Sequence, residues 1–146
     1  MAAALFRAHA AAGGELDKWR IESVGTWCAD GQPASPLAQL VMAERGIPLA
    51  THLSRSVDAN ILNQANVVLV MTRSHRDALC AEFPMARGKT HLISELDGFE
   101  FDIADPYGKP LSAYEACADS LEQLITRGYA KIASWAAPAS TQIENV

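Results

Sequence analysis

The residues with the most reactive side chains in this 146-residue sequence are its three cysteines, Cys28, Cys80 and Cys117. A cysteine thiolate can attack a phosphoryl group when it opens a C-x5-R loop, in which backbone N–H groups cradle the phosphate and the arginine clamps two oxygens. No arginine stands six residues after any of the three cysteines, and Arg87 follows Cys80 one residue too late. The printed sequence therefore contains no such nucleophile loop.

Packing explains the cysteines better than catalysis or metal binding does. Cys80 falls inside a predicted helix over residues 74–83, where the backbone N–H groups are already bonded, and we expect Cys80 and Cys117 to fill the core. Cys28 lies in a predicted loop and is the one candidate for a reactive thiol. Because the cysteines and the four histidines follow no ligand spacing, we expect no disulfide framework, no metal and no cofactor.

The segment from residue 102 to residue 108 carries the best local indication of a site. Asp105 precedes a proline on a predicted loop and is followed two residues later by Tyr107, so it could act as a general acid at the rim of a pocket. The same residues, Asp105-Pro106-Tyr107-Gly108, also suit a tight turn, with aspartate first and proline second. The spacing alone leaves both interpretations open.

Strands alternate with helices along the chain. The run 67–71 is apolar at successive positions, which is typical of an interior parallel strand covered on both faces. Further strands are expected at 21–25 and 90–93, and helices at 2–12, 36–45, 74–83 and 111–132. We therefore predict an α/β fold of three layers, a parallel sheet with helices on both faces. Residues 1–136 are expected to form one domain and residues 137–146 a loose tail.

The composition is that of a folded domain, because 49% of the residues are hydrophobic and 20% are charged. The net charge of -5 argues against a protein that binds the backbone of nucleic acids. No apolar run reaches the ~18 residues that a membrane-spanning helix needs, and the first residues lack the pattern of a signal peptide. We expect a cytoplasmic protein that binds neither nucleic acid nor membranes.

Five short segments carry a resemblance to a known family. They are Met1–Phe6, Glu22–Thr26, Gly46–Arg55, Val68–Arg76 and Asp105–Gly108, and they include MAAALF, ESVGT, HLSR, VLVMTRSHR and DPYG. In this order they resemble the low-molecular-weight protein tyrosine phosphatases, from the first residue to about residue 132. The resemblance implies that family's α/β fold and the hydrolysis of phosphomonoesters through a phosphocysteine.

The resemblance also assigns roles to particular residues. It implies that Asp105 is the general acid that protonates the leaving oxygen. It makes Trp27 and Tyr107 candidates for the walls of the substrate pocket or, equally, ordinary packed aromatic residues. The substrate would be a phosphorylated protein or a small phosphomonoester. The M-T-x-x-H sequence from Met71 to His75 is similar to a bacterial branch that includes protein-arginine phosphatases, so phosphoarginine is the alternative to phosphotyrosine.

The family's catalytic loop, C-x5-R-S-P, immediately precedes the methionine that matches Met1. We therefore expect a chain that is truncated at its N-terminus, lacks the interior first strand between residues 21–25 and 67–71, and is inactive as written. The helix predicted from Ala2 accordingly begins with no capping residue before it. Two accounts stay open: a start-site error in a normal phosphatase, or a shortened, non-catalytic binding or regulatory module.

A missing interior strand would leave two rows of backbone groups without partners. Each buried, unpaired group costs about 1–3 kcal/mol, against about 5–15 kcal/mol for the stability of a whole domain. We expect a poorly stable monomer, a strand borrowed from a partner or from the tail, self-association through unpaired strands, or a rearranged sheet.

Overall fold

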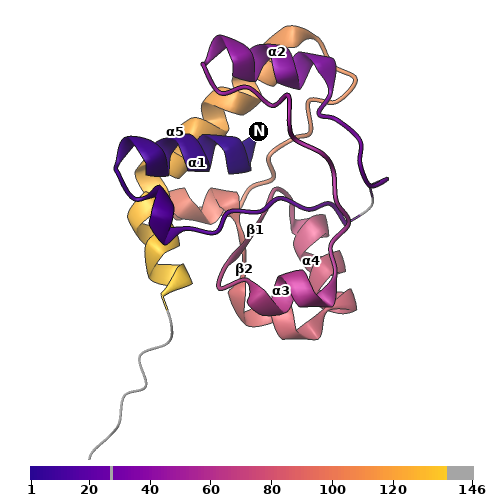
Figure 1. Ribbon diagram of the computed structural model, residues 1–146. Helices are drawn as coiled ribbons and strands as arrows, with labels where there is room; N and C mark the ends of the chain where they lie inside the picture. Colours follow the sequence, from indigo (N-terminus) through magenta and orange to yellow (C-terminus); the bar gives the residue numbers. More distant parts are fainter. Residues whose placement is uncertain (27, 138–146) are drawn as a thin grey trace, which may run out of the picture.

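The structure is a computed structural model that describes residues 1–26 and 28–137. Figure 1 shows a small parallel sheet with helices α1, α2 and α5 on one side and α3 and α4 on the other. In chain order the elements are α1 (Ala2–Ala12), η1 (Leu16–Lys18), α2 (Pro36–Glu44), α3 (Ala59–Gln64), β1 (Val68–Val70), α4 (Arg73–Glu82), η2 (Pro84–Lys89), β2 (Thr90–Leu92), η3 (Ile93–Asp97) and α5 (Leu111–Ala136). The predicted α/β fold with helices on both faces of a parallel sheet is confirmed.

Strand β1 separates two apolar clusters. It pairs in parallel with β2, and Val68 lies opposite Thr90. Because successive side chains of a strand point to opposite faces, Leu69 packs against the larger cluster, to which α1, α2 and α5 contribute. Val68 and Val70 pack against the smaller cluster, whose buried members are Leu62, Leu79 and Ala86. The apolar run of the sequence thus has its predicted place, with apolar neighbours on both faces.

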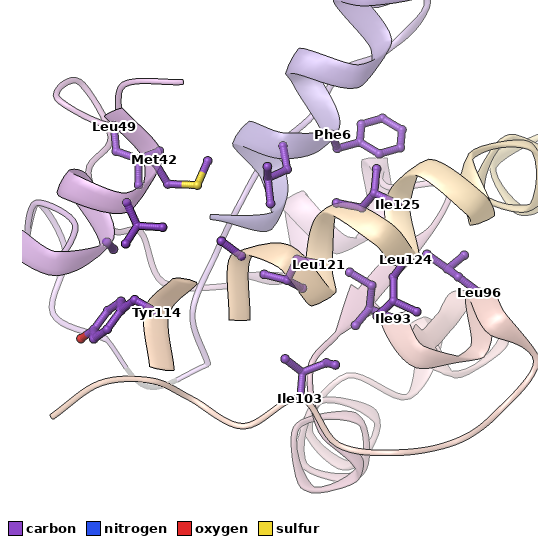
Figure 2. Close-up of a cluster of buried hydrophobic side chains, with 14 of the residues drawn as sticks. Phe6, Met42, Leu49, Ile93, Leu96, Ile103, Tyr114, Leu121, Leu124 and Ile125 are labelled. Carbon is purple, nitrogen blue, oxygen red and sulfur yellow. The ribbon is translucent and has the colours of Figure 1, made fainter. Parts of the chain in front are cut away.

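Helix α5 forms the centre of the larger cluster. Figure 2 shows Leu124 of α5 beside Ile93 and Leu96 of η3. Gly128 allows η3 to approach α5 closely, because a Cβ at this position would lie 2.5 Å from the Cβ of Leu96. The backbone of α5 therefore packs directly against the side chain of Leu96 in η3, without space for one additional methyl group.

Local side-chain caps fix the starts of two helices. Asp58 accepts a backbone N–H at the start of α3, and Thr72 does the same for α4. Helix α1 begins directly after Met1 without a side-chain cap, as expected. Ser35 occupies the expected N-cap position of α2, but it makes no capping bond, and its hydroxyl instead donates to the hydroxyl of Tyr114 at 3.4 Å. A tertiary contact has replaced the predicted local one.

The strand expected at residues 21–25 does not form. Residues 21–24 have no regular structure, and Gly25 alone makes a parallel bridge, with Ser56. A side chain at position 25 would not fit without a shift, because a Cβ there would lie 2.9 Å from the Sγ of Cys28. An extended segment becomes a strand only when a neighbouring strand pairs with it. Among the described residues the sheet consequently has two strands.

Two expectations concern the chain as a whole. Helix α5 ends at Ala136, and all but the first residue of the predicted tail, 137–146, lies outside the described residues, so the division into domain and tail stays a prediction. None of the helices in residues 1–26 and 28–137 combines the length and apolar character needed to cross a bilayer.

The contact between Gly128 and Leu96 leads to a prediction about stability. Gly128→Ala should lower the free energy of unfolding by about 1–3 kcal/mol, because the new methyl group must push η3 away from α5. Urea denaturation measures this change. Gly88→Ala is the matched control, since a Cβ there meets nothing within 4 Å. Equal stability of the Gly128→Ala variant and the original chain would contradict the close packing.

Candidate active site

A groove of about 1300 Å³ opens along one face of α1. Helix α1 contributes a row of small side chains, among them Ala4 and Ala8, and α5 contributes Cys117 and Leu121. The remaining walls come from residues 16, 21–23, 30–31, 46–49, 51–55, 71–72, 75 and 103–106. Segments that are distant in the sequence therefore meet at this groove, and it is the place to look for combined chemistry.

Asp105 lies exposed at the rim of the groove, on the loop between η3 and α5. The N–H of Ile103 donates to the backbone oxygen of Met71 at 2.8 Å, which ties this loop to the carboxyl end of β1. The carboxylate of Asp105 accepts the N–H of Tyr107 at 2.9 Å, and Gly108 has a positive φ of 75°. These are the features of a tight turn. The turn holds the carboxylate at the rim, so the turn and the general-acid interpretations are compatible.

The two predicted aromatic walls have different outcomes. Tyr107 is 76% exposed and does not line the groove. Trp27 lies outside the described residues. A role in holding substrate stays a prediction for both residues.

The opposite rim consists of two loops that are bonded to each other. The hydroxyl of Ser54 accepts the N–H of Gln32 at 2.9 Å. The carboxylate of Asp30 accepts the hydroxyl and the N–H of Ser56, both at 2.7 Å. These two bonds, the hydroxyl bond foremost, lower the pKa of Asp30 because they stabilise its charged form. The bonds fix the two loops of the rim relative to each other.

An ion pair joins this rim to residues 21–24. Arg55 donates to the carboxylate of Glu22, and Arg20 donates to the same carboxylate at 2.7 Å. The bonds from Arg55 and then from Arg20 lower the pKa of Glu22. Glu22 and Arg55 both line the groove. The pair therefore holds one groove wall in place without a strand ladder.

Arg7 and the first turn of α1 give this end of the groove a positive character, whereas burial lowers the pKa of both His52 and the Met1 amine. Burial is the main cause that lowers the pKa of His52, and the charges of the Met1 amine and Arg7 add to it. These three groups line the groove. The first N–H groups of a helix also carry a partial positive charge. An anionic group in the groove would therefore meet a favourable electrostatic potential at this end.

Cys117 packs against the larger apolar cluster, in line with the core position that the sequence predicts, and it also lines the groove. It is half-buried. Burial raises the pKa of its thiol, and the Asp105 carboxylate adds to this effect while the Met1 amine opposes it. A thiol with a raised pKa is a poor nucleophile near neutral pH. The four-residue spacing between Cys117 and Leu121 was a signal that both lie on one face of α5.

The other two cysteines also lack the environment of a nucleophile. Cys80 lies within α4, as predicted, but it is only half-buried and belongs to neither apolar cluster of the described residues. The Sγ of Cys28 lies 3.9 Å from the hydroxyl of Ser56 and from the backbone oxygen of Gly25. Among the described residues, the groove thus offers a carboxylate at its rim, the positively charged Arg7 and no activated thiolate.

Residues 1–135 match the low molecular weight phosphotyrosine protein phosphatases. The chain belongs to this family. It is 38% identical over 114 residues to a protein-arginine-phosphatase of Geobacillus stearothermophilus, which covers 77% of this chain and 76% of that protein. It is 33% identical over 103 residues to the low molecular weight protein-tyrosine-phosphatase Wzb of Salmonella typhimurium, which covers 70% of this chain and 68% of that protein.

Solved structures of the same family share the fold. The low molecular weight protein tyrosine phosphatase from T. tengcongensis superimposes with a TM-score of 0.83 at 35% identity, over 89% of this chain and 88% of that one. The YwlE arginine phosphatase from Geobacillus stearothermophilus superimposes with a TM-score of 0.81 at 36% identity, over 91% of this chain and 83% of that one. The predicted family and fold are confirmed. The match does not confirm the predicted N-terminal truncation, which stays a prediction, as does the cytoplasmic location.

The ion pair at the groove wall leads to a prediction about pH. Because the pKa of Glu22 is lowered in the folded chain, its stabilising effect is present above the unfolded-state pKa and is lost as the pH falls through the folded-state value. Glu22→Gln should therefore reduce the acid-induced loss of unfolding free energy by less than about 1 kcal/mol, since the pair is exposed. Urea denaturation at pH values between about 6 and 3 measures the difference. Glu44→Gln is the control at an exposed glutamate of α2, and the same acid dependence in both variants would contradict the role of Glu22.

Proposed function

We propose that this chain carries the proton-donor part of a protein phosphatase site, with Asp105 as the general acid. The observation that supports the proposal is the position of Asp105, held by a turn at the rim of a groove whose walls include the start of α1 and Arg7. In this arrangement phosphoryl oxygens bind against the positive end of the helix. Asp105 then gives its proton to the leaving oxygen when the ester bond breaks.

A general acid needs a nucleophile to act with. It contributes about 10²–10⁴-fold to a rate, or about 3–5 kcal/mol of activation free energy. Residues 1–146 contain no C-x5-R sequence, and burial suppresses the thiolate of Cys117. We infer that the polypeptide as printed does not hydrolyse phosphomonoesters, and that activity requires a strand and a C-x5-R-S-P loop joined ahead of Met1.

The family leaves two candidate substrates. Relatives named as arginine and as tyrosine phosphatases match this chain over similar shares of its length. Thr72 of the M-T-x-x-H sequence caps α4, which is a structural role compatible with either substrate. We propose phosphotyrosine in proteins as the substrate and phosphoarginine as the alternative. The ratio of kcat/KM on peptides that carry one or the other modification decides between them.

Two polypeptides test the need for a nucleophile loop. One is residues 1–146, and the other is the same chain extended ahead of Met1 by about fifteen to twenty residues, enough for one strand and a C-x5-R-S-P loop. We expect no turnover of p-nitrophenyl phosphate by the first and turnover by the second, because only the second has a thiolate in a phosphate cradle. Turnover by residues 1–146 that a thiol alkylator abolishes would overturn this part of the proposal.

The role of Asp105 is tested in the extended chain. Asp105→Asn should lower kcat on phenyl phosphate about 10²–10⁴-fold, because the poor leaving group then departs without a proton. Asp17→Asn, at an exposed position of η1 outside the groove, is the matched control. An unchanged kcat in Asp105→Asn would exclude Asp105 as the acid. An extended chain that folds but never turns over would favour a non-catalytic binding or regulatory module.

A further inference from the structure

Two aromatic side chains are exposed on the segment that joins η3 to Asp105. Phe99 is 71% exposed and Phe101 is 44% exposed. Folding normally removes large apolar side chains from water, and aromatic residues are enriched where one protein contacts another. Two of them within three residues of each other therefore indicate a surface that a second molecule covers. We call Phe99 and Phe101 the aromatic patch.

The backbone that carries the aromatic patch is fixed, although it forms no helix, strand or turn. The buried hydroxyl of Ser94 accepts the N–H of Phe101 at 3.0 Å and donates to its backbone oxygen at 2.7 Å. The guanidinium of Arg73 donates to the backbone oxygen of Glu100, and the N–H of Arg73 donates to the Asp102 carboxylate at 2.9 Å. Because these backbone groups are already bonded, a partner would meet the side chains, on a segment that needs little further ordering.

The aromatic patch and Asp105 lie on one continuous segment of the chain. Asp105 follows Phe101 by four residues and Phe99 by six. Their Cα atoms are therefore at most about 14 Å and about 22 Å from that of Asp105. Ile103, between them, is bonded to Met71 and lines the groove, whereas neither aromatic residue does so. The aromatic patch is thus close to the groove and separate from it.

The surface between the aromatic patch and Asp105 is acidic. Glu100 pairs with Arg76 at 3.3 Å and also with Arg73. Asp102 and Asp105 instead accept backbone N–H groups, and no lysine or arginine side chain among the described residues forms an ion pair with either carboxylate. A lysine or arginine in a chain that lies along this segment would therefore meet a complementary charge.

We propose that the aromatic patch is a docking surface for the phosphorylated protein, which places one apolar side chain on Phe99 and Phe101 while its phosphorylated residue lies in the groove. This inference rests on the proposed phosphatase function. An extended chain advances about 3.3 Å per residue, so the apolar residue stands within about six residues of the phosphorylated one. The favoured sequence has leucine or phenylalanine at that distance and a basic residue in between.

Two phosphotyrosine peptides test the docking surface. One carries leucine about five residues from the phosphotyrosine, the other carries serine there, and both have a lysine in between. On the extended chain, which has the nucleophile loop, the leucine peptide should have an about tenfold lower KM at the same kcat, because the added contact is equally strong in the ground state and the transition state. Equal KM values for the two peptides would overturn the proposal.

Protein variants test whether the aromatic patch is the contact. The double variant Phe99→Ala/Phe101→Ala should lose the preference for leucine, and Phe99→Ala alone should lose part of it. Leu40→Ala is the matched control, because Leu40 is 44% exposed on α2 outside the groove, and it should keep the preference. Thermal unfolding followed by circular dichroism checks that each variant is folded. A preference that survives the double substitution would overturn the proposal.

The position of the leucine tests the geometry. The preference should appear on one side of the phosphotyrosine only, because the aromatic patch lies on one side of Asp105. It should weaken when the leucine is moved to about twelve residues away, since an extended chain of that length spans about 40 Å. A preference that is the same on both sides and at both distances would overturn the proposal. Replacing the intervening lysine by glutamate should raise KM, and the effect should shrink in high salt.

The docking surface and the proposed function can fail separately. Turnover with equal KM values would keep the function and exclude the docking surface. An extended chain without turnover would exclude the function, and an NMR titration of residues 1–146 with the unphosphorylated leucine peptide then tests the surface. Shifts at residues 99–101 that the serine peptide does not cause would support a binding surface, and their absence would overturn it. Self-association that the double substitution abolishes would identify a second copy of this chain as the occupant and overturn the proposal.

Discussion

The parallel pairing of β1 with β2 is the contact on which the rest of the molecule depends. It fixes the boundary between the two apolar clusters, because side chains alternate between the two faces of a strand. It also sets the position of the loop that carries Asp105, since the backbone oxygen of Met71, directly after β1, accepts the N–H of Ile103. A shift of β1 by one residue would exchange the side chains of both clusters and displace Asp105 with its loop.

Helix α5 packs against the turn after β2 and also lines the groove. Its contact with η3 is as close as Gly128 allows, and its other surface supports α1 and provides Cys117 and Leu121 to the groove. The face of α1 that looks into the groove consists largely of alanine. Small side chains there leave volume unfilled, whereas Leu5 and Phe6 on its other face are buried in the core. One helix therefore both completes the hydrophobic core and borders the open groove.

The site lies beside a sheet that has two strands among the described residues. Asp105, the positive start of α1 and the bonded rim around Asp30 and Ser56 are all in place. The loop of Asp105 is held through Met71, whereas the rim around Ser56 is joined to residues 21–24 by the pair of Arg55 with Glu22.

The sequence by itself determined the helices, the strand β1 and the turn at Asp105. Their signals act within a few residues, as Asp58 and Thr72 show at their helix starts, and the family resemblance rested on the same local segments. Tertiary structure decided that residues 21–24 form no strand, that Ser35 bonds Tyr114, and that Cys117 faces the groove. The reason is physical: strand pairing and burial depend on which distant segment lies alongside, and this is settled only when the chain packs.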